Sequence, residues 1–491
     1  MAITNLTGIE DTLALILECA GDLARIESTL LPALRKLCDH APSNGESSSR
    51  SGPSSSRSQA PAVSDAVLCQ PVQGNVDPLS VLDPAVHSIG MLYILVARAT
   101  HSAGSVENGT LLLPHITAFV QRFSPPQVHL AGDKVAQLAA TFSALGDQVT
   151  NPESALQLLQ ALASRFLTRS ESITALHPML AYQYLKTARY AEAATMLIDL
   201  PLIDADTSIT PLVHSDILQY FYYAALIYIK LDRLHDAIDA LETCISSPAV
   251  AVSAIHMDAY KKLVLVQLLA DGKVSPVPQY TPQVITRAWK QMGSPGQTPY
   301  NTFASAYARG DDKGLDAARR IAEERKDVFE KDRNMGLVRR CLALLTQRRV
   351  QKLGEVYSAL SLNQIAQKIG AQGDDVVQGV YADVQDIVRK GWIYATLSPP
   401  RGASGAVNGD WVVHFDSFGG DSFTSTSSIS LLEDKIRTAK QWQALLQERD
   451  RQIQKSPAYL TRGLKIRDAR TAGADAYAEG DEFHAFDDAD Y

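Results

Sequence analysis

Apolar residues recur every three or four positions along most of this 491-residue chain, which is the spacing of amphipathic helices. Residues 8–38 predict two short helices, with Gly21 as a candidate break. From Leu79 to Lys390 the helical pattern dominates, and the alternation typical of strands is almost absent. The sequence therefore predicts a mainly α protein, with its N-terminal helices in residues 1–40.

A stretch rich in Ser, Gly and Pro interrupts this pattern. It contains SNGESSSRSGPSSSRSQAP and lies between Ala41 and Asp65. This composition buries too little apolar surface to offset the entropy lost when a chain becomes ordered. We predict a disordered linker over residues 41–78.

Two segments of the helical region resemble each other. Residues 184–193 have the sequence YLKTARYAEA and residues 228–237 have YIKLDRLHDA, a spacing of 44 residues. Each predicts a helix end, a tight turn and the start of an antiparallel helix, and the spacing suits helical repeats. We predict a helical-repeat (TPR-like) solenoid over residues 79–330, an architecture that usually holds other proteins. An irregular helical bundle is the alternative, because only two copies are visible.

Residues 331–416 predict a winged helix, which is the second half of the predicted architecture. An amphipathic helix comes first, followed by a basic turn at residues 348–352 and a second short helix that reaches Leu360. Ser361 and Gln364 then have the spacing of a capping box, which predicts the start of the next helix.

The wing strands and the charges of the helix before them indicate whether this domain binds DNA or protein. Residues 391–397 and 411–415 are aromatic and β-branched and predict two paired strands around an enlarged loop. The preceding helix, residues 374–390, carries four aspartates against one arginine and one lysine. Helices that enter DNA grooves normally present basic or amide side chains, so protein docking is favoured over DNA binding.

Two surfaces are candidate protein-interaction sites. The first is the second wing strand, predicted to be an edge strand that pairs with a neighbour, with Trp411, Val412, Val413, His414 and Phe415. The second is a long helix within residues 417–456, whose start is marked by capping-box spacing at Ser430 and Glu433. Its narrow apolar seam suits packing against other helices and consists of Leu432, Ile436, Ala439, Trp442, Leu446 and Ile453. The alternative is that this seam packs back on its own winged helix.

The formal net charge of −8 comes mostly from the end of the chain. No Lys or Arg follows Arg470, whereas seven acidic residues do. We predict residues 457–491 to be an acidic disordered tail. The rest of the chain is near neutral, without the basic surface that binds nucleic acid phosphates, so nucleic acid is an unfavoured partner.

The sequence indicates neither a membrane nor a secreted protein. No segment approaches the roughly 18 apolar residues of a membrane span, and the N-terminus lacks the features of a signal or transit peptide. The five cysteines are scattered, with no C-x-x-C pair. We expect a reduced protein that is cytoplasmic and nuclear.

The sequence lacks the usual catalytic motifs. The eleven histidines form neither H-x-H nor H-E-x-x-H, and no phosphate-binding loop, dinucleotide-binding glycine pattern or G-x-S-x-G is present. His87, His177 and Cys341 lie in apolar surroundings and are expected to be structural. We predict that the chain is not an enzyme and has no catalytic residues, metal site or cofactor.

One segment, KDRNMGLV at residues 331–338, resembles the start of the PCI domain in the COP9 signalosome subunit 3 family. The likeness continues through seven more segments: residues 87–90, 222–228, 247–253, 260–265, 281–284, 357–362 and 413–415. The linker, the enlarged wing loop and the acidic tail depart from the family pattern.

This resemblance implies a scaffold role in the complex that removes a ubiquitin-like modifier from cullins and so regulates cullin-RING ubiquitin ligases. In that family the isopeptidase belongs to another, metal-bearing subunit. The implied partners are other signalosome subunits, contacted through the winged helix and a C-terminal helical bundle, and indirectly cullin-RING ligases.

Three rival functions are open at this point. One is the equivalent PCI subunit of the proteasome lid or of a translation initiation factor complex. A second is a winged-helix nucleic-acid adaptor, supported by the basic residues Arg348, Arg349 and Lys352. The third is an enzyme of unfamiliar type, with a site assembled from distant residues.

Overall fold

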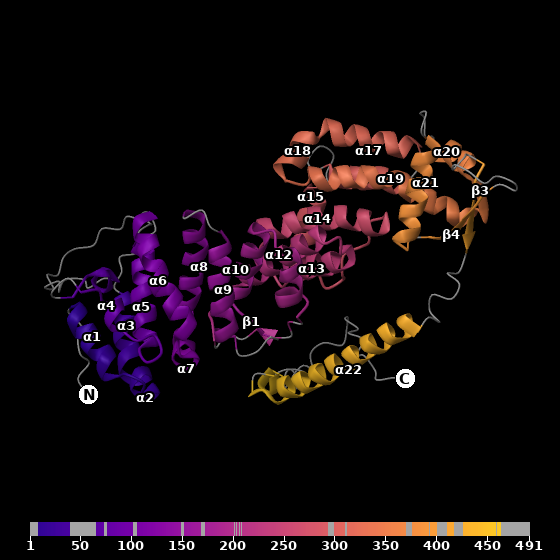
Figure 1. Cartoon of the computed structure of the whole chain (residues 1–491). Coiled ribbons are helices and arrows are strands. Elements are labelled where there is room, and N and C mark those ends of the chain that lie inside the picture. Colours follow the sequence, from indigo (N-terminus) through magenta and orange to yellow (C-terminus); the bar gives the residue numbers. More distant parts are fainter. Residues whose placement is uncertain are drawn as a thin grey trace, which may run out of the picture. The chain divides into compact units, whose positions relative to one another are not determined.

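The structure is a computed structural model (Figure 1) that describes residues 8–39, 65–72, 76–101, 106–148, 152–167, 172–200, 202, 204–205, 207, 209–292, 299–309, 312–369, 376–391, 393–399, 410–416, 426–457 and 459–462. Most of the predicted linker, the wing loop and the predicted tail lie outside these residues. The chain divides into two compact units, Met1–Ile393 with Leu397–His414, and Tyr394–Thr396 with Phe415–Tyr491. The domain boundaries proposed from the sequence stay predictions.

The N-terminal segment contains the predicted helices. Helix α1 (Ile9–Glu18) ends before Gly21, whose φ of +75° is a left-handed conformation that glycine adopts without strain. A continuous helical stretch follows, made of α2 (Leu23–Arg25), the π-helical turn η1 (Ile26–Leu30) and α3 (Leu31–Asp39). The prediction of two helical segments separated at Gly21 is confirmed.

Helices dominate the next part of unit 1, as predicted (Figure 1). Two two-residue strands, β1 (Ser172–Ile173) and β2 (Asp204–Ala205), pair in parallel between them. The helices and helical turns are η2 (Asp65–Cys69), α4 (Pro78–Val81), α5 (Ser88–His101), α6 (Val106–Arg122), α7 (Pro125–Val128), η3 (His129–Ala131), α8 (Gly132–Gln148), α9 (Pro152–Phe166), α10 (Leu176–Lys186), α11 (Tyr190–Ala193), η4 (Ala194–Ile198), α12 (His214–Lys230), α13 (Leu234–Ser246), α14 (Ala254–Asp271), α15 (Gln283–Met292), α16 (Tyr300–Arg309), α17 (Asp312–Glu324) and α18 (Lys326–Lys331).

The two similar segments form the same turn, and the structure contains a third example. In each, one residue other than glycine has a positive φ: Ala188 at 55°, Asp232 at 62° and Arg333 at 56°. The next amide donates to the carbonyl of an aromatic residue five positions earlier, which closes the helix end. These bonds are Arg189 N to Tyr184 O (3.2 Å), Arg233 N to Tyr228 O (3.0 Å) and Asn334 N to Phe329 O (2.8 Å).

One hydrophobic core runs through the repeats, from Ile9 to Leu345. Its last members lie on α19 (Met335–Val356), a helix of 22 residues. Further along α19, Val350 is also buried but lies outside this core, as do buried residues of the following domain such as Ile365 and Val384. Helix α19 therefore packs its first half in the repeats, while its second half also contributes to the next domain.

That domain has the order of a winged helix: α19, β3 (Ala359–Ser361), α20 (Leu362–Ile369), α21 (Val376–Arg389), β4 (Tyr394–Ser398) and β5 (Val412–Asp416). The predicted capping box is confirmed, because Gln364 N donates to Ser361 Oγ (3.2 Å) and Ser361 N donates to Gln364 Oε1 (3.1 Å). The predicted basic turn at residues 348–352 is wrong, since these residues are helical in α19. The predicted short helix reaching Leu360 is instead the end of α19 and strand β3.

Helix α22 (Thr426–Lys455) is the predicted long C-terminal helix. It lies within the predicted range of residues 417–456, but it begins four residues before Ser430, so the capping-box prediction at Ser430 is wrong. Among the residues that the structure describes, no helix has the length and apolar character needed to cross a bilayer.

Candidate protein-interaction site

The wing is a three-stranded sheet with the order β3-β5-β4. Strand β5 pairs antiparallel with β3, placing Val413 opposite Leu360 and His414 opposite Ala359. Strand β4 lies on the other side of β5. The prediction that β5 is the edge strand is therefore wrong: β5 is the central strand, and β4 is an edge in the part of the chain that the structure describes.

The predicted wing residues mostly hold the domain itself together. Val413 is fully buried and Phe415 nearly so. Trp411 packs edge-on against Tyr381 of α21 at 6.0 Å between ring centroids, and its carbonyl accepts from Leu362 N at 2.9 Å. His414 is exposed, and its Nε2 lies 3.1 Å from Ser398 Oγ of β4. Of this group, His414 has the most accessible side chain, while Val412 is half-buried.

Strand β4 is the better candidate surface on the wing. Tyr394 at its start is 45% exposed, and the free edge of β4 offers backbone groups to a strand from another chain. Sequence reasoning missed this because the identity of the edge depends on β3, which lies before two helices. No local pattern indicates that β3 pairs with β5.

Helix α22 presents the predicted seam as exposed apolar side chains. Leu432, Leu446 and Ile453 are 57%, 50% and 51% exposed, Ile436 is similar, Ala439 is exposed and Trp442 is half-buried. Asp450 occupies the one gap in the steps of three and four, between Leu446 and Ile453. Polar residues at such places set register and partner choice between packed helices at some cost in stability. The seam thus has the pattern of a helix that pairs with other helices.

Two of the three basic residues that favoured a nucleic-acid adaptor, Arg348 and Arg349, are engaged inside the molecule. Arg348 and Arg349 are both 8% exposed. The Arg348 guanidinium donates to the carbonyls of Leu269 (2.7 Å) and Ala270 at the end of α14. Positive side chains at helix C-termini are stabilising, because they meet the free carbonyls and the negative end of the helix dipole.

Two other helix ends are held in the same way. Arg349 donates to the carbonyls of Ile369 (2.5 Å) and Lys368 (3.1 Å) at the end of α20. Lys352 Nζ donates to the Ala308 carbonyl in α16 at 3.4 Å. These three cations therefore connect helices to one another, and since Arg348 and Arg349 are buried, Lys352 is the one of the three that stays exposed.

Acidic residues on α21 face α19. Gln347 Nε2 donates to Asp383 Oδ1 (3.1 Å) and Asp386 Oδ2 (3.2 Å), and Lys390 Nζ lies 2.7 Å from Asp386. The hydrogen bond from Lys390 lowers the pKa of Asp386. Within the described residues Asp383 and Asp386 are matched by Arg389 and Lys390. The two aspartates that make the predicted balance acidic, Asp374 and Asp375, lie outside those residues.

A buried polar network joins two segments that carry the family resemblance. Lys262 Nζ donates to Asn334 Oδ1, Asn334 Nδ2 donates to Tyr300 Oη, and Tyr300 Oη donates to Asp332 Oδ2, each at 2.8 Å. Lys261 Nζ completes the network by donating to Asp332 Oδ1, also at 2.8 Å. The network links α14, α16 and the turn before α19.

Lys262 and Asn334 are 6% and 0% exposed. Burial lowers the pKa of the Lys262 ammonium, while the charges of Asp258 and Asp332 act in the opposite direction. One feature of the sequence indicates this network: Lys262 directly precedes the apolar run LVLV, and a lysine buried in such a run needs a polar partner.

The histidines and cysteines expected to be structural lie in structural settings. His177 is 3% exposed, its Nδ1 accepts from Thr174 N at 3.0 Å, and burial lowers its pKa to about 4. His87 Nδ1 accepts from the amide of Asp83. Burial raises the pKa of the Cys341 thiol. Among the described residues, no group of three or more His, Cys, Asp or Glu side chains could hold a metal ion.

The order of elements defines a class of protein: a helical-repeat array that continues into a winged helix and carries a long C-terminal helix. Residues 59–285 match the family model described as COP9 signalosome complex subunit 3, N-terminal helical repeats. The chain is 27% identical over 387 residues to COP9 signalosome complex subunit 3 of Dictyostelium discoideum, which covers 78% of this chain and 86% of the relative. It is also 27% identical over 346 residues to the subunit of the same name in Drosophila melanogaster, covering 66% and 74%. The chain is thus related to COP9 signalosome subunit 3, and the resemblance predicted from its motifs is confirmed.

Proposed function

We propose that the chain is a non-catalytic scaffold subunit of the COP9 signalosome. In this role it supports deneddylation, the removal of a ubiquitin-like modifier from the cullins of cullin-RING ubiquitin ligases. The observation that carries the proposal is the similarity to subunit 3 over 78% of the chain. The isopeptidase activity is then supplied by a different, metal-bearing subunit.

The surfaces of the molecule support a role in assembly. The free edge of β4 suits strand pairing with a neighbouring wing, and the exposed seam of α22 suits a bundle formed with C-terminal helices of other subunits. A repeat array with one continuous core supplies a rigid arm for further contacts. The proposed partners are other signalosome subunits and, through them, cullin-RING ligases, in the cytoplasm and the nucleus.

The test is affinity purification of the tagged full-length chain from its native cells, with mass spectrometry of bound proteins and a deneddylation assay on modified cullin. Co-purification of signalosome subunits with this activity is the expected result. Proteasome-lid or initiation-factor subunits in their place would overturn the assignment of the complex. A reconstituted signalosome with and without this chain then separates scaffolding from catalysis, because the purified chain alone should not release the modifier.

A further inference from the structure

A cavity of about 250 Å³ lies between α12 and α13, and we call it the α12–α13 cavity. Its volume is below the roughly 300–1,000 Å³ of most small-molecule sites, so it suits one side chain better than a cofactor. Three aromatic rings, those of Tyr220, Phe221 and Tyr228, line its walls. The carboxylates of Asp236 and Asp239 lie at the same cavity, on consecutive turns of α13.

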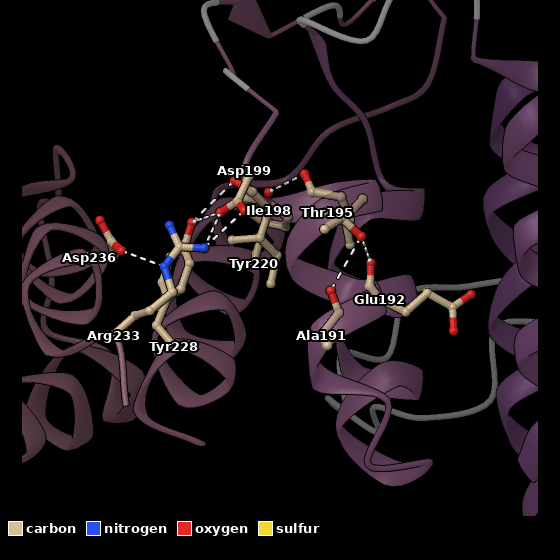
Figure 2. A network of polar contacts seen from close by, with 10 residues as sticks. Ala191, Glu192, Thr195, Ile198, Asp199, Tyr220, Tyr228, Arg233 and Asp236 are labelled. Carbon is tan, nitrogen blue, oxygen red and sulfur yellow. Dashed lines mark hydrogen bonds and ion pairs between the residues drawn. The ribbon is translucent and has the colours of Figure 1, made fainter. Parts of the chain in front are cut away.

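One guanidinium group of the protein itself, that of Arg233, contacts two of the cavity's lining residues, Asp236 and Tyr228 (Figure 2). Arg233 Nη1 donates to both oxygens of Asp199, at 2.8 and 2.9 Å, and Arg233 Nε donates to Asp236 Oδ2 at 2.6 Å. The same guanidinium lies 4.7 Å from the centre of the Tyr228 ring. Tyr228 Oη in turn donates to Asp199 Oδ1 at 3.1 Å. Two lining residues of the cavity, Asp236 and Tyr228, thus already bind a guanidinium group together with the neighbouring Asp199.

Asp239 is the carboxylate that this internal arginine does not neutralise. Its side chain makes no hydrogen bond or ion pair with any residue in the described ranges, and it is exposed at the cavity. Partial burial and then the charge of Asp236 raise the pKa of Asp239, while His235 acts in the opposite direction. A cation would be attracted to the unpaired Asp239 carboxylate, whereas an anion would be repelled.

The remaining walls suit the stem of a long basic side chain. Ala224 and Ala240 form small apolar surfaces, and Phe221 adds an aromatic one. Arginine and lysine bury their methylene groups on such surfaces while the charged end reaches polar groups.

We propose that the α12–α13 cavity binds one arginine side chain presented by a partner protein. Its guanidinium pairs with Asp239, and its stem lies against the aromatic rings. Charge complementarity selects this occupant, and the site is separate from the β4 edge and the α22 seam. The proposal does not depend on which complex the chain joins.

The test uses the full-length chain with labelled alanine methyl groups and a short capped peptide, Gly-Arg-Gly, followed by NMR. The methyl groups of Ala224 and Ala240 line the cavity and report on binding. The matched control peptide has citrulline, a neutral analogue of nearly the same shape, in place of arginine. We expect saturable shifts of these methyl signals with the arginine peptide at concentrations of about 10 mM or below, and no saturation with the citrulline peptide.

Two variants locate the effect. Asp239→Asn should weaken binding about fivefold or more, because it removes the unpaired carboxylate and keeps the size of the side chain. Asp316→Asn, an exposed aspartate on α17 that is not part of the cavity, should bind as the parent chain does. Equal shifts with both peptides, no shifts at all, or unchanged affinity in Asp239→Asn would each overturn the proposal.

Discussion

Replacing Asn334 by alanine should weaken the junction between the repeats and the winged helix. The change removes the acceptor of Lys262 Nζ and the donor to Tyr300 Oη, both at 2.8 Å. A hydrogen bond to a charged group contributes about 1.5–3 kcal/mol and one between neutral groups about 0.5–1.5 kcal/mol, so we expect a loss of about 2–4 kcal/mol. The side chain makes no cap hydrogen bond to α19, so this loss does not include a helix cap.

A double-mutant cycle isolates the Lys262 part of this loss. Lys262→Met keeps the stem of the side chain but removes its charge, which leaves Asn334 without its donor. If the two side chains act together, the double variant should lose about 1–3 kcal/mol less than the sum of the single variants. Additive losses, within about 0.5 kcal/mol, would refute the coupling.

Hydrogen exchange with mass spectrometry is the suitable assay, because a chain of this size does not unfold in one step and local free energies are needed. Peptides from α14 and α19 should exchange faster in Asn334→Ala, while peptides from α5 should not. Asn363→Ala is the matched control, since Asn363 is exposed on α20 and its side chain makes no hydrogen bond with the described residues. Exchange in Asn334→Ala that equals this control would show that the network contributes nothing.

Three further predictions concern the seam, a buried histidine and the internal arginine contacts. Leu432→Asp combined with Leu446→Asp should release the chain from its complex, as measured by co-purification, while the winged helix stays folded; undiminished assembly would contradict the proposed role of α22. Burial lowers the pKa of His177 from 6.5 in the unfolded chain to about 4 in the folded chain, so between these pH values the unfolded chain binds a proton that the folded chain does not bind. The free energy of unfolding should therefore decrease as the pH falls from 6.5 towards 4. At about pH 5 this loss is about 2 kcal/mol, and His177→Gln should reduce the pH dependence of the local stability of α10, measured by hydrogen exchange, by that amount; an unchanged dependence would refute it. Arg349→Met should speed hydrogen exchange in α20 by removing about 1.5–3 kcal/mol of hydrogen bonding to its C-terminus, whereas exchange like that of the parent chain would show that this contact is dispensable.

Two local signals in the sequence predicted the local structure correctly. The capping box at Ser361 and Gln364 depends only on residues three positions apart, and the structure contains both of its hydrogen bonds. The helix-turn-helix pattern at Tyr184 and Tyr228 likewise depends on neighbours in the chain. The third copy was missed because it begins with Phe329 and has Val338 at the small buried position.

The capping-box spacing at Ser430 and Glu433 is a local signal that was wrong, since both residues lie inside α22. Two other wrong predictions share a different cause, which is dependence on distant partners. Arg348 and Arg349 suggested an exposed basic turn, but carbonyls at the ends of α14 and α20 bind them inside the protein. Strand β5 suggested an edge, but β3 pairs with it from across two helices. The candidate site was therefore predictable as a helix seam and only partly predictable as a wing surface.

Helix α19 has a mechanical consequence for the assembled protein. Its first half lies in the core of the repeats, and its second half carries Val350 and the arginine that closes α20. A force applied to the wing is therefore transmitted to the helical repeats through α19, a continuous helix of 22 residues that is about 33 Å long at 1.5 Å per residue. A truncated protein that begins at residue 331, the predicted start of the winged helix, would therefore leave the first half of α19 without the repeats against which it packs.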